Sequence, residues 1–358
     1  MESSSYSILK EFISPEELKE KVLSKYNINI HDIENIKFKD TEKQRAVYKV
    51  LTDKGSRCLK KVYYNKPSLL FVYSIIEWLN SRGIYCPRLI STKNGLKYVE
   101  YNKDLFIMMD WVEGRKCDYD NIEDVLASAK NLAAIHSSSL YFKPIEGSDI
   151  KISGTDYFNS YNKHFLQLLE ASNMAFNIKD KFSKLYLEHF EYNIEKAKES
   201  VYLLSQIDFS KPLGDEVSMG AICHLDYVNK NLIFTPDNKI CVIDFDKSAI
   251  DYPVHDISSF LKRILKRKNT SWDFEIFKNS MESYESIRKL SYKEYIVILS
   301  FLMFPQKYWK ISRDYYKNRH QCDREAFISI LKKVIEQEKQ HDEFCTRALE
   351  YLNEKFKE

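Results

Sequence analysis

Residues 222–246 read ICHLDYVNKNLIFTPDNKICVIDFD, and this stretch decides the fold prediction. It contains Asp226, Asn231 and Asp244 at a spacing typical of ATP-dependent phosphoryl transfer. That reaction needs a carboxylate facing the acceptor hydroxyl and two oxygen ligands that hold magnesium against the phosphates. We therefore predict Asp226 as the base that orients the acceptor, and Asn231 and Asp244 as the magnesium ligands.

A hairpin is expected within this stretch. Two apolar, strand-like runs flank residues 235–238, whose sequence Thr-Pro-Asp-Asn is typical of a turn with proline at its second position. Counting back from the turn places Asn231 opposite Val242 and Asp244 diagonal to Asn231, at about 7–8 Å. Two side chains at that distance can hold one hard cation. The competing interpretation is a surface hairpin whose Asp and Asn residues only form turns.

The residues beside the predicted ligands have two interpretations each. His224 is a candidate catalytic residue, or a buried histidine that orients the loop through hydrogen bonds with the backbone. Asp246 and Lys247 closely follow Asp244. They would contact a second metal or the substrate, or they lie on the rim as solvated charges.

The order His-x-Asp-x4-Asn followed by Ile-Asp-Phe resembles the aminoglycoside phosphotransferase and choline kinase group, distant relatives of protein kinases. A narrower resemblance is to the CotS-type spore coat proteins of spore-forming bacteria. It is carried by CHLDYVNKNLI, by VIDFDKSAIDYPVHDIS (242–258) and by FPQKYWKI (304–311). The resemblance implies fold and ATP chemistry strongly, but the substrate hardly at all.

The implied fold is α+β, a bilobal protein-kinase-like fold with ATP and magnesium as cofactors. The predicted N-lobe, 1–112, has an N-terminal helix, an antiparallel sheet and one further helix. The predicted C-lobe, 113–358, is larger, mostly helical and contains the catalytic hairpin 222–246. Strands are expected at 46–52, 57–64, 97–101 and 105–112, and helices at 15–26, 66–81, 120–139, 156–204, 256–268, 273–289, 291–304 and 323–356.

Met109-Asp110-Trp111-Val112-Glu113-Gly114 resembles the segment that joins the lobes in this group. The resemblance implies that the Asp110 carbonyl and the Val112 amide bind adenine in the cleft between the lobes. Met109 would shape the back of that pocket, although a methionine beside a strand is also explained as plain core.

A kinase of this type also needs a strand lysine on the α- and β-phosphates. Lys60 occupies the position that the resemblance assigns to it, and Lys61 is the alternative with the register shifted by one. Strand alternation sends the two side chains to opposite faces of the sheet. Only one of them can therefore face the nucleotide, and we favour Lys60.

The sequence departs from the group's pattern at two places. The helix glutamate that pairs with the strand lysine is replaced by Val72 or Tyr73. Glu77 lies five residues beyond Val72, about 140° around a helix, so it is expected to face solvent instead. The loop 40–45 contains no glycine to lie over phosphates. Both departures argue against efficient turnover.

Two other residues are interpreted structurally. His136, in the sequence LAAIHSSS, is expected to be a structural histidine. Asp256 directly precedes a helix that begins with Ile257, so it is predicted as the helix N-cap. The resemblance implies that Asp256 also braces the loop of Asp226.

Composition excludes several classes of protein. The 358 residues suggest two domains, and a net charge of +3, from 55 basic and 52 acidic residues, gives no reason to expect nucleic acid as the main partner. Seven cysteines without a Cys-x-x-Cys pair favour a reducing compartment and argue against a zinc site. The longest apolar run, 295–304, is about half of a membrane-spanning helix, and no signal peptide opens the chain. We expect a cytoplasmic protein that binds no membrane.

Two functions from different classes remain open. The first is an ATP- and magnesium-dependent phosphotransferase acting on a hydroxyl of a small molecule or sugar. The second is a kinase-fold scaffold of the spore coat, weakly active or inactive, that acts by binding other coat proteins. In both cases the resemblance implies synthesis in the cytoplasm of the mother cell, followed by a place in the spore coat.

Overall fold

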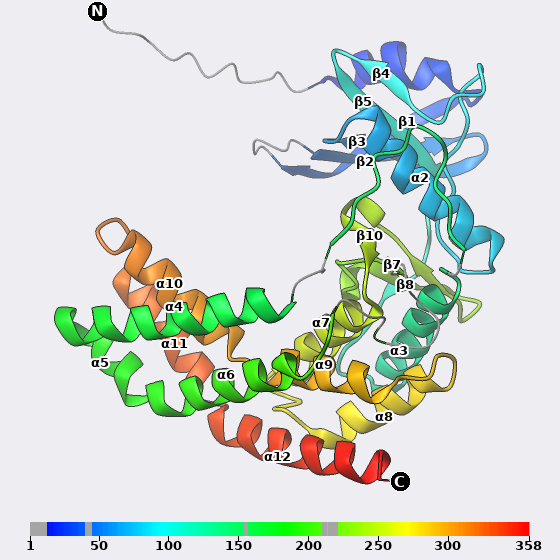
Figure 1. Cartoon of the computed structure of the whole chain (residues 1–358). Coiled ribbons are helices and arrows are strands. Elements are labelled where there is room, and N and C mark those ends of the chain that lie inside the picture. Colours follow the sequence, from blue (N-terminus) through cyan, green and yellow to red (C-terminus); the bar gives the residue numbers. More distant parts are fainter. Residues whose placement is uncertain are drawn as a thin grey trace, which may run out of the picture. The chain divides into compact units, whose positions relative to one another are not determined.

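The computed structural model describes residues 13–39, 45–139, 141–153, 157–209, 213 and 221–357. Apart from Arg45, the loop 40–45 lies outside the described residues. The chain divides into two compact units (Figure 1). Unit 1 comprises Met1–Ser81, Tyr85–Gly114 and Pro144–Asp149, and unit 2 comprises Arg82–Ile84, Arg115–Lys143 and Ile150–Glu358.

A short segment of the chain, Pro144–Asp149, returns to unit 1 after the first helix of unit 2. Ser68 Oγ donates a hydrogen bond to Asp149 Oδ2 at 3.1 Å, and the Ile145 amide donates to Ser74 Oγ at 2.9 Å. These bonds fix the segment on the helix α2 (Lys66–Ser81), which the sequence predicts with the same limits. The predicted boundary between the lobes, after residue 112, leaves this segment out of the N-lobe.

Unit 1 is built on a five-stranded antiparallel sheet in the order β1-β2-β3-β5-β4. The turn between β2 and β3 contains Gly55, whose φ of 88° is a conformation that glycine adopts without steric cost. The strands are β1 Ile30–Lys39, β2 Arg45–Thr52, β3 Gly55–Val62, β4 Val99–Tyr101 and β5 Asp104–Asp110.

Strand β1 is absent from the sequence-based prediction, and its pairing explains why. The register against β2 shifts between Ile30 and Asp32 and again between Asn35 and Lys37. Each shift inserts a residue and breaks the alternation of apolar and polar positions by which a strand is recognised.

The N-terminal helical segment lies on this sheet. Its parts are α1 (Pro15–Glu17), a π-helical turn (Leu18–Val22) and a 3-10 turn (Leu23–Lys25). The Ser14 hydroxyl accepts a hydrogen bond from the Glu17 amide at 3.1 Å and so caps the start of this segment.

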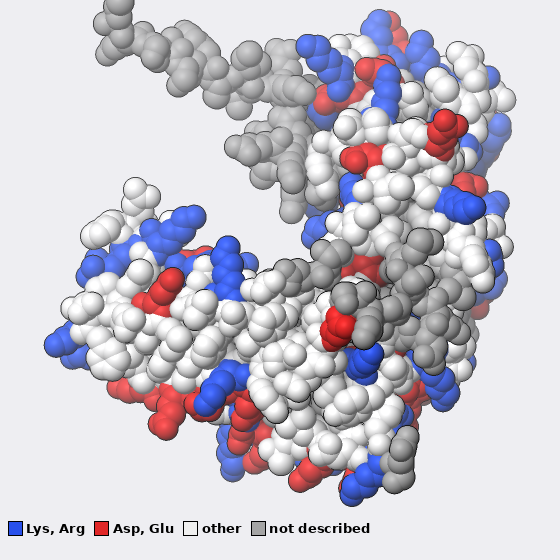
Figure 2. All heavy atoms as spheres, in the orientation of Figure 1, with Lys and Arg blue, Asp and Glu red and all other residues white. Residues whose placement is uncertain are grey.

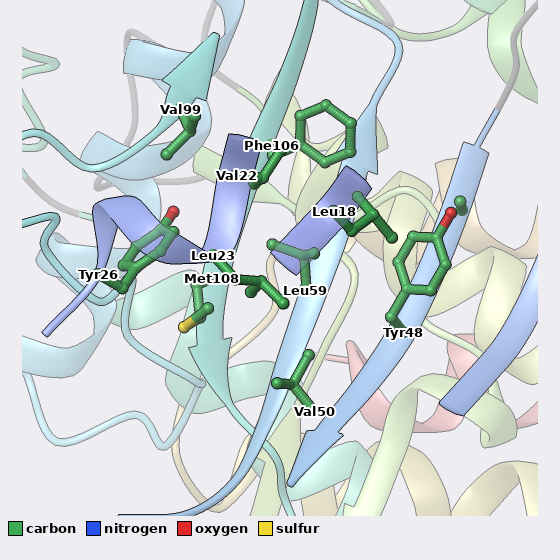
Figure 3. Packing of buried hydrophobic residues seen from close by; sticks show 11 residues of the cluster. Leu18, Val22, Leu23, Tyr26, Tyr48, Val50, Leu59, Val99, Phe106 and Met108 are labelled. Carbon is green, nitrogen blue, oxygen red and sulfur yellow. The ribbon is translucent and has the colours of Figure 1, made fainter. Parts of the chain in front are cut away.

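The core of unit 1 forms between this segment and one face of the sheet (Figure 3). Leu59 of β3 is fully buried at its centre, and Met108 of the neighbouring β5 is buried beside it. Figure 3 shows their side chains directed toward those of the helical segment. The other labelled members are Leu18, Val22, Leu23, Tyr26, Tyr48, Val50, Val99 and Phe106.

Unit 2 is mostly helical. The predicted helical region 156–204 is three helices. It is interrupted first at Lys179, which adopts a φ of 56° before Asp180 caps a new helix, and again at His189. The helices are α3 Ile122–Ser137, α4 Tyr157–Ile178, α5 Lys181–Glu188, α6 Phe190–Ser205, α7 Pro253–Leu265, α8 Phe274–Glu285, α9 Tyr292–Met303, α10 Gln306–Asn318, α11 Arg324–Ile335 and α12 Glu338–Lys355.

Two small antiparallel sheets of unit 2 carry the stretch that decided the fold. In one, β8 (Leu232–Phe234) pairs with β9 (Ile240–Val242) and with the two-residue β6 (Arg115–Lys116). In the other, β7 (Ala221–Cys223) pairs with β10 (Ala249–Asp251). The segment from residue 224 to 231 therefore leaves one sheet and enters the other.

The surface of unit 2 includes exposed apolar side chains on α4, among them Leu166 and Phe176. On the face drawn in Figure 2, uncharged side chains dominate the surface over this helix. Within the part of the chain that the structure describes, no helix has the length and apolar character required to span a bilayer.

The packing of Leu59 leads to a first prediction. Leu59→Ala is expected to lower the free energy of unfolding by about 2–5 kcal/mol, because it leaves a cavity in a fully buried site. Leu51→Ala on the adjacent strand is the matched control, since that side chain is 48% exposed. Urea unfolding followed by circular dichroism measures both. Equal stability of the two variants would contradict the assigned core.

Candidate functional site

The hairpin that carries Asn231 forms with a register one residue away from the predicted one. Leu232, and not Asn231, lies opposite Val242. The shift follows from Asn238, whose φ of 58° allows a three-residue loop at 236–238. The Thr235 amide donates a hydrogen bond to the Lys239 carbonyl at 2.9 Å and closes this loop.

The new register changes the neighbours of Asn231. The Ile243 amide donates a hydrogen bond to the Asn231 carbonyl at 3.0 Å. Asn231 therefore lies beside Ile243, and Asp244 is the next residue along that chain. Asp244 is therefore one residue away from the position beside Asn231, whereas the predicted register placed it two residues away.

Two residues of the site have left-handed backbone conformations. Leu225 has a φ of 56°, and Asp244 has a φ of 68°. Aspartate tolerates this region better than most residues, whereas leucine is rarely found there. Such conformations cost about 1–3 kcal/mol each and persist only where the surroundings enforce them.

Asp256 enforces the turn at Leu225. Its Oδ2 accepts a hydrogen bond from the His224 amide at 2.6 Å, and its Oδ1 accepts one from the Leu225 amide at 2.8 Å. The prediction that Asp256 is an N-cap is wrong, because α7 begins earlier, with Tyr252 as the cap and Pro253 as the first residue. Asp256 lies in the first turn with its buried carboxylate directed at the loop of Asp226.

The carboxylate of Asp256 is in turn held by His136. His136 Nε2 lies 3.5 Å from Asp256 Oδ2, and its Nδ1 lies 2.6 Å from the Tyr284 hydroxyl. Burial alone would raise the pKa of Asp256, but its hydrogen bond with His136 and the further contacts with both histidines outweigh burial and lower that pKa. Burial lowers the pKa of His136. The arrangement is that of a structural histidine.

His136, Cys223 and Asp256 lie close enough together to suggest a metal site, with potential ligand atoms within 4.8 Å of one another. Two observations oppose that reading. Both carboxylate oxygens of Asp256 already accept backbone hydrogen bonds, and burial raises the pKa of the Cys223 thiol far above its ordinary value. A thiol must lose its proton to bind a metal, so we interpret this cluster as a buried brace.

His224 connects the two halves of the site. The Asp226 amide donates to His224 Nδ1 at 3.2 Å, and His224 Nε2 lies 3.0 Å from the Ile243 carbonyl. Both ring nitrogens of this fully buried side chain are therefore used by the backbone. This is the geometry expected of a histidine that orients the loop, and it fixes Asp226 relative to the segment that leads into Asp244.

Asn231 and Asp226 are also bonded directly. Asn231 Nδ2 donates to the Asp226 carbonyl at 2.9 Å and lies 3.4 Å from Asp226 Oδ2. Since the amide nitrogen is used in this way, the amide oxygen of Asn231 is turned away from Asp226. No described residue donates a hydrogen bond to that oxygen, which is therefore chemically suited to a cation.

One lysine contacts Asp226, and a second contacts the backbone of Asp246. Lys247 Nζ lies 3.4 Å from Asp226 Oδ1, and the Lys247 side chain is 53% exposed against 13% for Asp226. Lys151 Nζ donates to the carbonyl of the buried Asp246 at 3.3 Å. The sequence left open whether Lys247 lies at the site or on a solvated rim, and the contact with Asp226 favours the site. The sequence does not indicate Lys151, because this residue is distant from Asp246 in the chain and belongs to no motif.

The candidate phosphate lysines lie in unit 1, on opposite faces of β3. Lys61 shares the face of Leu59, and its Nζ lies 2.7 Å from Asp104 Oδ2 of β5. Lys60 lies on the other face, between Val47 of β2 and Ile107 of β5 in the pairing. Both lysines are buried.

The predicted adenine-binding segment follows β5 in unit 1. Met109 pairs with Cys58 and bridges Leu89, and the Asp110 carboxylate lies 2.8 Å from Arg57 Nη1. Beyond them, the Trp111 amide donates to the Ser56 carbonyl at 3.3 Å. Val112 follows and is partly buried.

Comparisons with known proteins agree with this fold. The sequence model of the family described as "Spore coat putative kinase YutH" matches residues 19–348. The chain belongs to this family. Spore coat protein S of Bacillus subtilis (strain 168) is 22% identical over 338 residues, which are 94% of this chain and 95% of that protein.

The chain shares its fold with solved phosphotransferases. An aminoglycoside phosphotransferase from Alicyclobacillus acidocaldarius superposes with a TM-score of 0.80 at 20% identity, covering 98% of this chain and 99% of that one. Spectinomycin phosphotransferase APH(9)-Ia, solved with ADP and spectinomycin, has a TM-score of 0.58 at 17% identity, covering 91% and 95%. The predicted kinase-like α+β fold and the predicted family are confirmed.

One departure from the kinase pattern is visible in unit 1. Val72 is 2% exposed in α2, and Tyr73 beside it is partly buried, so neither position offers a carboxylate to a strand lysine. Glu77 is partly buried on the same helix.

The brace at Asp256 leads to a second prediction. Asp256→Ala is expected to lower the free energy of unfolding by about 3–5 kcal/mol, because it leaves buried donors without their charged partner. Asp256→Asn is expected to lose less, since it keeps one oxygen acceptor. The control is Glu195→Ala, which removes one partner of an exposed pair with Lys198 and is expected to cost at most about 0.5 kcal/mol. Thermal and urea unfolding measure these differences, and an unchanged stability of Asp256→Ala would refute the brace.

Proposed function

We propose that this protein is an ATP- and magnesium-dependent phosphotransferase that acts on a hydroxyl group of a small molecule or sugar and is associated with the bacterial spore coat. The observation that supports the proposal is the placement of Asp226, Asn231 and Asp244 on neighbouring segments. The Asp256 carboxylate accepts hydrogen bonds from the amides of His224 and Leu225, and the His224 ring accepts one from the Asp226 amide. A kinase requires these three groups together.

Asp226 is assigned the role of base. The acceptor oxygen attacks the γ-phosphorus, its proton passes to the Asp226 carboxylate, and the bond from that phosphorus to the bridging oxygen of ADP breaks. Little covalent chemistry is required beyond this, so holding the groups in line is the main task of the chain. The rigid loop at Leu225 serves that task.

Asn231 and Asp244 are assigned to magnesium. An amide oxygen that receives no hydrogen bond from the described residues and an adjacent carboxylate are hard oxygen ligands of the kind that Mg²⁺ prefers. When bound, the ion neutralises charge on the β- and γ-phosphates. Asp246, buried two residues further along, is the candidate for support of a second ion.

The nucleotide roles fall to residues of unit 1. Lys60 is assigned to the α- and β-phosphates, and the ion pair of Lys61 with Asp104 supports this choice, because it commits Lys61 to the other face. Asp110 and Val112 are assigned to adenine through their backbone, with Met109 lining the pocket. ATP use agrees with the solved relatives, one of which contains ADP and another, an amicoumacin kinase, AMP-PNP and Ca²⁺.

Association with the spore coat is inferred from the family. Its description and the name of the Bacillus subtilis relative both refer to the coat. We propose that the protein is made in the cytoplasm of the mother cell and joins the coat, where other coat proteins are its partners.

A second candidate function is a scaffold of the coat with weak or no catalysis. The apolar pair at Val72 and Tyr73 favours it, because an active kinase uses a glutamate there to orient the phosphate lysine. The ordered arrangement around Asp226 favours the enzyme. Nucleotide binding separates the two.

The third prediction concerns nucleotide binding, which calorimetric titration with ATP measures in the presence and absence of Mg²⁺. Micromolar binding that depends on Mg²⁺ is expected. Asp244→Ala should weaken it by more than about tenfold, since even outer-shell partners of a metal contribute that much. Asp237→Ala is the control, because this 58% exposed carboxylate lies in the turn of the same hairpin.

Asp226→Ala separates binding from transfer. We expect it to keep the ATP affinity of the wild type and to lose at least about 100-fold in the rate of phosphoryl transfer, because it contacts the acceptor and not the nucleotide. Absence of ATP binding with and without Mg²⁺ would leave the scaffold as the function.

A further inference from the structure

We propose that the acceptor carries an anionic group, a phosphate or a carboxylate, beside its reacting hydroxyl, and that Lys247 and Lys151 bind this group. The inference rests on the proposed function, because it takes Asp226 as the base that the hydroxyl approaches. It assigns a substrate class to the same site.

The position of Lys247 is the first observation. It ends a short 3-10 turn, Phe245–Lys247, directly after Asp244, and its Nζ lies 3.4 Å from Asp226 Oδ1. Its side chain remains 53% exposed, so the ammonium group is both beside the base and open to an incoming molecule. A hydroxyl that reaches Asp226 must therefore come within range of this positive charge.

Lys151 adds a second ammonium group at the same edge. The backbone around it pairs with β10, because the Ile250 amide donates to the Lys151 carbonyl at 2.8 Å and the Ser153 amide donates to the Ile250 carbonyl at 2.9 Å. This pairing directs Lys151 Nζ to the carbonyl of Asp246, the residue before Lys247, at 3.3 Å. One cation thus lies beside Asp226, and a second, from a separate part of the chain, lies at the backbone of the residue before Lys247.

The acids of the segment after Lys247 are occupied by internal donors. Asp251 is 2% exposed, and its carboxylate accepts hydrogen bonds from the Tyr157 hydroxyl and the Tyr252 amide. His255 Nδ1 lies 2.7 Å from the same carboxylate. Asp256, the other acid of residues 247–256, is used by the brace. Both acids of residues 247–256 are therefore engaged within the protein.

His255 pairs with Asp251 within the same segment. Burial alone would lower its pKa, but the hydrogen bond with Asp251 outweighs burial and raises that pKa. The His255 side chain is 30% exposed. A phosphate or carboxylate on the acceptor gains charge-assisted hydrogen bonds from the two lysines, whereas an ammonium group gains none from them.

The test measures ADP release with acceptors matched in shape and different in charge. The probes are glucose, glucosamine, glucose 6-phosphate and gluconate, with glycerol, ethanolamine and glycerol 3-phosphate as a second series. In at least one series we expect the anionic member to have a kcat/KM roughly tenfold or more above that of the amine. The phosphate and carboxylate members then show which anion is preferred.

Variants assign the effect to the lysines. In Lys151→Met we expect the ratio of kcat/KM for the anionic over the neutral acceptor to fall by roughly tenfold, through KM. Lys247→Met should reduce the same ratio. Lys239→Met is the matched control, because this 68% exposed lysine lies on the hairpin and pairs with Asp237 instead of Asp226. Calorimetric titration of the preferred anionic probe in the absence of ATP gives a second readout, and binding should weaken in Lys151→Met.

Three outcomes would overturn the proposal. The first is that amines are used as well as, or better than, anions. The second is that no anionic probe raises ADP release although Mg²⁺-dependent ATP binding is intact. The third is that Lys247→Met and Lys151→Met lower kcat equally for all acceptors, which would assign these lysines to the transferred phosphoryl group. If the wild type does not bind ATP, the proposed function itself is refuted. The two failures are therefore distinguishable.

Discussion

The hydrogen bonds that one buried carboxylate accepts from two consecutive backbone amides are the constraint on which the candidate site depends. Asp256 accepts from His224 and Leu225 and thereby stabilises a left-handed turn that leucine would otherwise avoid. Asp226 follows this turn directly, so its direction is set by the brace. Through the ring of His224 the same constraint reaches Ile243, and with it the position of Asp244.

The brace joins helices that are far apart in the chain. His136 of α3 supports Asp256 of α7, and Tyr284 of α8 supports His136. A carboxylate buried among apolar residues is stable only when its partners are all present, because an unpartnered charge in that environment costs several kcal/mol. The helical core of unit 2 and the geometry of the site are therefore formed together.

This dependence explains what could be predicted from the sequence. Local signals sufficed for the helix α2 and for the approximate place of the hairpin, because each follows from residues close in the chain. The fold class followed from the spacing of Asp226, Asn231 and Asp244 and from the resemblance that it carries.

Other features depend on conformations that a pattern does not encode. Strand β1 was missed because bulges interrupt its alternation, and the hairpin register was wrong by one because Asn238 is left-handed. Asp256 was taken for a cap because the proline that starts α7 lies three residues earlier. Lys151 has no local signal at all, since only the pairing with Ile250 brings it near Asp246.

The most direct test of the central claim is a crystal structure with Mn²⁺ and a non-hydrolysable ATP analogue, with the metal located by its anomalous scattering. The account predicts a metal within about 2.0–2.6 Å of both the Asn231 amide oxygen and an Asp244 carboxylate oxygen. It also predicts that the Asp226 carboxylate faces the γ-phosphate. Nucleotide bound with its metal away from Asn231 and Asp244 would contradict it.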